Sequence, residues 1–210
     1  MPHPRSPFRN LVITAAALAL SACATSYTGP IEVTRFVAEE PTALGKGTIG
    51  LEFPDEITNL NARNAFAAAI ADELSRLGYQ VVLDGSQAVA QTASIRTSRN
   101  ELAAASSRGP VDVGVGGSTG SYGSGLGVGI GINLGGASSG PNVLTELSVR
   151  IRRDDGTSLW EGRAQQPISV NSPLSDIEAS AQALATALFQ DFPGGSGETI
   201  AIDVDELTHP

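Results

Sequence analysis

The sequence predicts an α+β fold: a two-layer sandwich in which two helices cover a mixed, mostly antiparallel sheet, with a glycine-rich, hairpin-like insert. Three observations lead to this prediction. Several short segments alternate apolar and polar residues, as half-buried strands do. Two longer segments repeat apolar residues every three or four positions, which is typical of helices with one buried face. The segments are ordered strand-strand-helix-strand-strand, insert, strand-strand-helix-strand, so one domain over residues 31–204 accommodates them all.

The first half of the domain contains four expected strands and one helix. Strands are predicted over residues 31–37, 47–53 and 79–84, and a weaker one over 88–97. The helix is expected over residues 61–78, with Asn61 as N-cap and Gly78 as its C-terminal stop. Its apolar stripe comprises Phe66, Ile70, Leu74 and Leu77.

The second half begins with an expected hairpin. Residues 143–153 alternate, an Asp-Gly turn follows at 154–157, and residues 158–164 form the return strand, with Trp160, Gly162 and Ala164 on one face. A helix is predicted to begin at Ser172 and Pro173 as N-cap and first residue. Its stripe comprises Ile177, Ala181, Leu184, Leu188 and Phe192. The last strand is expected over 198–204, with Ile200, Ile202 and Val204 on one side.

The insert over residues 109–142 holds thirteen of the 24 glycines of the chain. Its segment "GLGVGIGINLGG" (125–136) has neither the glycine spacing nor the lysine of a phosphate-binding loop, and its apolar run is about half the length of a membrane span. Two interpretations stay open. One is a β-hairpin arm whose glycine face admits a partner backbone, and the other is a low-complexity insert without fixed shape. In the first, the partner-contact strand comprises Leu126, Val128, Ile130, Ile132 and Leu134.

The N-terminus predicts secretion and lipid attachment. Residues 1–22 form a signal peptide, with Arg5 and Arg9 before an apolar stretch too short to span a bilayer. The following "LSAC" resembles the bacterial lipobox, formed by Leu20, Ser21 and Ala22 before the acylated Cys23. Several acyl chains on Cys23 suffice for stable membrane anchoring. Residues 23–30 are then the lipidated cysteine and its tether, and Ala24 favours the outer membrane by analogy with known sorting rules.

Charge and cysteine content exclude other classes. The chain carries a net charge of −9, and removing Arg5 and Arg9 with the signal peptide leaves 11 basic against 22 acidic residues. This balance argues against a nucleic-acid partner, which needs a basic surface. Cys23 is the only cysteine, so no intramolecular disulfide is expected.

Together these segments resemble one family. The lipobox, "VTRF", "LSRLGYQVV", the glycine-rich middle, "LSVRIRRDDGTSLWEGRA" and "ALFQDFPGGSGETI" look like the uncharacterised bacterial lipoproteins carrying domain of unknown function 4136. The similarity spans about residues 31–204. It implies an α+β envelope domain and supplies no catalytic residues or ligand.

Catalytic, metal and cofactor sites are not predicted. After the signal peptide the only histidine is His209, in an acidic tail (205–210) that we expect to be frayed and solvated rather than to hold a divalent cation. The adjacent acids Asp154 and Asp155 fall in the expected turn. The arginines Arg150, Arg152 and Arg153 are interpreted as a salt-bridged sheet surface, and Trp160 as a core anchor.

The function expected from the sequence is therefore a non-enzymatic structural, assembly or binding role. The protein would be anchored by its acyl chains in the outer membrane, with its domain facing the periplasm and a protein partner contacted by the glycine-rich hairpin. Two alternatives stay open: a cell-envelope hydrolase using unidentified carboxylates, and a membrane-associated oligomer built by the glycine-rich strands.

Overall fold

The computed structural model describes residues 26–39, 41–53, 59–83, 88–102 and 143–208. In this part of the chain seven strands form one sheet. They are β1 (Ile31–Val37), β2 (Thr48–Glu52), β3 (Gln80–Val82), β4 (Gln91–Glu101), β5 (Val143–Arg153), β6 (Ser158–Ile168) and β7 (Thr199–Ile202). The helices are α2 (Leu60–Arg76) and α3 (Ile177–Phe189), and the short 3-10 helices are η1 (Pro41–Ala43), η2 (Pro173–Ser175) and η3 (Val204–Thr208).

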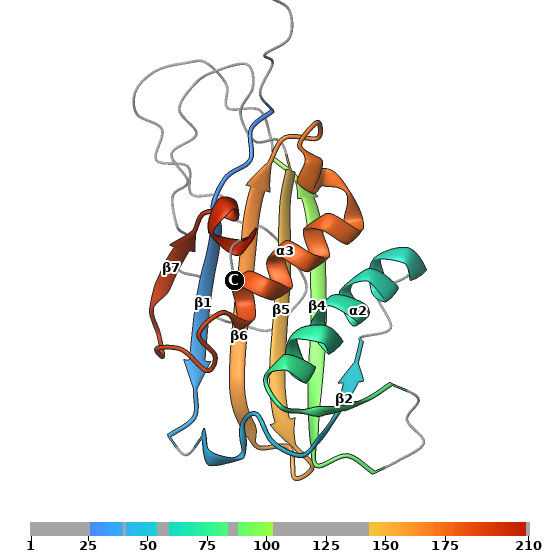
Figure 1. The fold of residues 1–210 in the computed structure, drawn as a ribbon, viewed down its shortest axis with the longest axis vertical. Coiled ribbons are helices and arrows are strands. Elements are labelled where there is room, and N and C mark those ends of the chain that lie inside the picture. Colours follow the sequence, from blue (N-terminus) through green and yellow to red (C-terminus); the bar gives the residue numbers. More distant parts are fainter. Residues whose placement is uncertain (1–25, 40, 54–58, 84–87, 103–142, 209–210) are drawn as a thin grey trace, which may run out of the picture.

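The sheet is mixed and mostly antiparallel. Its strand order is β3-β2-β4-β5-β6-β1-β7, and only β2 pairs in parallel, with β3 and β4. Both helices lie on the same face of the sheet (Figure 1). This arrangement confirms the predicted α+β sandwich. No helix in the described ranges is long and apolar enough to cross a membrane. The predicted hairpin insert lies outside the described residues.

The core lies between the sheet and the two helices. Val149 and Ile151 of β5 and Leu184 and Leu188 of α3 are all fully buried in it. Most of the other buried core residues belong to the predicted apolar stripes, because alternate strand positions and every third or fourth helix position point inward. The hydrophobic effect acting on this interior therefore joins the two layers.

Trp160 anchors one end of that core, as predicted. Its ring stacks on Phe189 with the ring centroids 5.4 Å apart, and Phe192 packs against it at 5.2 Å. The indole Nε1 donates to the carbonyl oxygen of Pro193 at 2.9 Å, which satisfies its polar edge. Trp160 thus fixes the segment that follows α3.

The opposite face of the sheet is polar. Arg150 bonds Glu161 at 2.8 Å on the neighbouring strand, and Arg152 bonds Glu52 at the same distance. Both arginines are partly exposed, so each pair contributes little to stability. The interpretation of Arg150 and Arg152 as a salt-bridged surface is confirmed.

Both helices begin at a different residue from the one predicted. The N-cap of α2 is Asn59, whose side chain accepts from the backbone N–H groups of Asn61 and Ala62. Ser172 does act as a cap, with Pro173 after it, but of η2. The longer helix α3 starts at Ile177, capped by Asp176. Each segment holds two residues able to cap, and the tertiary packing of the chain decides between them.

Strand lengths also differ from the predictions. β4 continues to Glu101 and β6 to Ile168, because each pairs along its whole length with β5. Of the three apolar residues expected on one side of the last strand, Ile202 is buried, whereas Ile200 is 38% exposed. β7 lies at the edge of the sheet, so Ile200 has less of the molecule to pack against.

A buried arginine links the sheet to the end of α3. Arg35 of β1 is 5% exposed, and it donates from Nε to the carbonyl of Leu188 and from Nη2 to that of Ala187. A cation is favourable at a helix C-terminus, where carbonyl groups lack helical partners. Burial lowers the pKa of Arg35, and the charge of Asp191 acts in the opposite direction. Arg35 therefore holds the chain where it turns from α3 towards β7.

Candidate functional site

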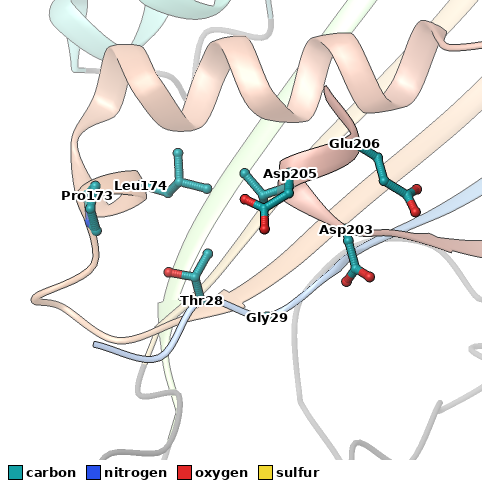
Figure 2. A pocket seen from close by; sticks show the side chains of 8 residues that line it. Thr28, Gly29, Pro173, Leu174, Asp203, Asp205 and Glu206 are labelled. Carbon is teal, nitrogen blue, oxygen red and sulfur yellow. The ribbon is translucent and has the colours of Figure 1, made fainter. Parts of the chain in front are cut away.

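An open recess of about 740 Å³ lies at one end of the sheet. It is lined by residues from three separate parts of the chain (Figure 2): Thr28, Gly29, Pro173, Leu174, Asp203, Val204, Asp205 and Glu206. The first two precede β1, the next two belong to η2, and the last four lie in η3 and just before it. The fold therefore assembles this recess from segments that are distant in the sequence.

Hydrogen bonds of the backbone and of hydroxyl groups hold Thr28 and Gly29, just before β1, in place at the recess. The N–H of Gly29 donates to the carbonyl of Pro167 at 2.9 Å, and the hydroxyl groups of Thr28 and Ser172 lie 2.7 Å apart. The buried side chain of Gln166 donates from Nε2 to the carbonyl of Gly29. A Cβ on Gly29 would lie only 2.8 Å from the Pro167 carbonyl oxygen, so the close approach of the two backbones requires glycine.

The acidic wall of the recess comes from the chain after β7. The N–H of Glu206 donates to the carbonyl of Asp203, and Leu207 packs against the core. In Figure 2 the side chain of Asp205 points towards Leu174 and Thr28, and that of Glu206 points away from them. The wall contributes three acidic residues, Asp203, Asp205 and Glu206, to the lining, whose other members are apolar or uncharged.

Several buried polar atoms close to this end of the sheet have no hydrogen-bond partner among the described residues. They include Oε1 of Gln166, Oγ1 of Thr145, which is its cross-strand neighbour, and Oγ of Ser169. Buried groups of this kind are commonly satisfied by internal water. In the described part of the chain no group of three or more histidine, cysteine or acidic residues could hold a metal ion.

The recess contains residues that the sequence does not predict to lie together. The sequence places Thr28 and Gly29 in the tether, and Asp205 and Glu206 in a frayed and solvated tail. The tail is not frayed up to Thr208, because residues 204–208 form η3, but Asp205 and Glu206 are exposed to solvent as expected. The available signal was Leu207, an apolar residue within an acidic segment, which packs against the core.

The other candidate residues divide into two groups. Asp154 and Asp155 lie in the turn between β5 and β6, and the carboxylate of Asp155 accepts from the N–H of Thr157 at 2.8 Å. That bond lowers the pKa of Asp155. Cys23, the lipobox residues 20–22, the strand residues 126–134 and His209 lie outside the described residues.

The chain has limited similarity to known proteins. No family model matches the chain. An uncharacterized protein of Zymomonas mobilis is 43% identical over 58 residues, which is 27% of this chain and 22% of that protein. The chain therefore matches less than a quarter of the length of this relative.

Solved structures resemble the chain more loosely. A PDZ domain protein from Parabacteroides distasonis matches with a TM-score of 0.48 and 15% identity, covering 90% of this chain and 42% of that one. A PelC dodecamer from Paraburkholderia phytofirmans matches with a TM-score of 0.39 and 10% identity, covering 75% of this chain and 94% of that one.

Proposed function

We propose that this chain is a lipid-anchored protein of the bacterial cell envelope, acylated at Cys23 and held in the outer membrane with its domain facing the periplasm. The observation that carries the proposal is the lipobox-like "LSAC" directly after a short apolar stretch and an arginine-bearing start. The resemblance to lipoproteins with domain of unknown function 4136 points in the same direction.

The contacts of Tyr27 and Thr28 support a short anchor. The carbonyl of Tyr27 accepts from the N–H of Ser169, and Thr28 bridges to Ile168. Tyr27 is four residues after Cys23, which is a reach of at most about 14 Å for an extended chain. An acylated Cys23 would therefore keep this end of the sheet, with its recess, close to the bilayer.

The role that we propose for the domain is binding or assembly without catalysis. Arg150 and Arg152 of the basic cluster form surface salt bridges, and the adjacent acids Asp154 and Asp155 lie in a turn. These are structural uses of the side chains. The open recess and the polar sheet face leave surface for contacts with other envelope components.

We propose further that residues 126–134 contact a protein partner. Glu101 at the end of β4 is paired with Val143 at the start of β5, and Val143 is paired with Ile168. Ile168 also bridges to Thr28. The chain therefore leaves β4 and enters β5 at the end of the sheet that Cys23 would anchor, which supports a partner contact on that side of the domain.

Substitution of the cysteine tests the anchor. Cys23→Ser should abolish acylation, because a hydroxyl does not replace the thiol in lipid attachment, and the protein should leave the membrane fraction. Mass spectrometry of the N-terminal peptide, with Ser21→Ala as a variant that keeps the cysteine, reads out the modification. A Cys23→Ser protein that still carries lipid would refute the proposal.

A further inference from the structure

The outer edge of β7 is an open position in the sheet. Within the described residues β7 is the terminal strand and pairs with β1 alone. Thr199, Ile200 and Ala201 are exposed, and the side chain of Ile200 is 38% accessible. Such an edge presents unpaired N–H and C=O groups that can receive another strand.

Few of the usual protective features occur within this strand. Natural edge strands are commonly blunted by charged side chains, proline or a bulge. Residues 199–202 are uncharged, contain no proline and pair with β1 in unbroken register. The hydroxyl groups of Thr34 and Thr199 lie 2.6 Å apart, which further ties β7 to its neighbour. The edge is therefore well formed but short.

The charges at the two ends of β7 restrict what can pair with it. Exposed Glu198 precedes the strand and exposed Asp203 follows it. Antiparallel pairing of β7 with a second copy of itself about its centre would place Glu198 opposite Asp203 at both ends. Like charges directly opposite one another destabilise a strand pair, so self-pairing is disfavoured. A strand with basic residues at those positions would instead be attracted at both ends.

We propose that the edge of β7 is a docking site for an extended polypeptide segment with an uncharged four-residue core between two lysine or arginine residues. Strand addition supplies main-chain hydrogen bonds, and the flanking charges select the partner. The five-residue separation of Glu198 and Asp203 sets the same separation for the two basic residues. A residue opposite Ile200 would cover its exposed side chain.

The proposal is tested by measuring, with fluorescence anisotropy, how tightly the labelled peptide Lys-Thr-Val-Thr-Val-Lys binds to the purified full chain. The peptide should bind, and the version with glutamate in place of both lysines should not. A version with alternate backbone nitrogens methylated should also fail, since it cannot complete the strand pairing. Glu198→Lys/Asp203→Lys should weaken binding of the lysine peptide roughly fivefold and favour the glutamate peptide. Asp72→Lys/Glu178→Lys, two exposed helix positions, is the control with the same change of net charge.

Four results would overturn the proposal. Equal binding of the methylated and unmethylated peptides would show attraction by charge without strand pairing. Absence of binding by the lysine peptide would show that the edge does not accept a strand. If the full chain self-associates and Ala201→Lys abolishes the self-association, the edge is occupied by a second copy. If the lysine peptide binds only after residues 111–136 are deleted, the edge is occupied by that segment of the same chain.

Discussion

Gly162 lies at a point in the sheet where a side chain has no room. A Cβ there would collide with the ring of Trp160 and lie 2.8 Å from Cδ1 of Leu188. Gly162→Ala should therefore lower the free energy of unfolding by about 1–3 kcal/mol, the usual cost of overpacking a core. Urea denaturation measures the loss. Gly195→Ala, where the nearest atom is an exposed glutamate oxygen at 3.4 Å, should change the free energy by less than about 0.5 kcal/mol.

Tyr79 makes the stability of the protein depend on alkaline pH. Tyr79 is 4% exposed, and its hydroxyl donates to Oε1 of Gln91. Burial raises the pKa of the phenol above its usual value of 10.0, and a hydrogen bond with the backbone of Gly45 acts in the opposite direction. The phenol therefore loses its proton more readily in the unfolded chain, so stability falls as the pH rises above about 10. Tyr79→Phe should weaken this dependence and cost about 1 kcal/mol at neutral pH. Thermal unfolding between pH 8 and 11 measures both effects, and an unchanged pH dependence in the variant would contradict the assignment.

At the scale of elements, the end of α3 depends on Arg35 of the neighbouring sheet. Arg35→Met keeps the apolar stem and leaves the carbonyls of Ala187 and Leu188 without their donors, so we expect a loss of about 2–4 kcal/mol. Arg96→Met, on the exposed face of β4, should cost less than about 0.5 kcal/mol. Equal effects of the two substitutions in chemical denaturation would show that the cap does not stabilise the helix.

The elements differ in how far their sequences predict them. Residues 31–37 and 143–153 form β1 and β5 at the predicted bounds, because their alternation is regular and both are paired along their length. The start of α3 is predicted less well, because both Ser172 and Asp176 can cap a helix and only the packed structure shows which does so. The recess is not predicted at all, since its residues come together only in the folded chain.

At the scale of the whole molecule, the glycine-rich insert should be separable from the fold. Glu101 and Val143 are register partners, so the β4–β5 pairing does not need the intervening chain to hold its ends together. Deletion of residues 111–136 should therefore leave the unfolding midpoint within a few degrees of that of the full chain. A partner protein that crosslinks to the anchored full chain in cells should no longer crosslink to the deletion variant. Circular dichroism and crosslinking with mass spectrometry measure the two results. An unchanged crosslinking pattern would contradict a partner contact through residues 126–134.

The sequence by itself determined the fold class, because alternation and helical spacing are local patterns that follow from the geometry of strands and helices. It also identified the polar face around Arg150 and Arg152 and the anchoring role of Trp160. The tertiary structure alone decided that Arg35 caps α3, that β7 is an edge, and that residues before β1 meet η2 and η3 around a recess. Those features depend on contacts between residues far apart in the chain, which no local pattern specifies.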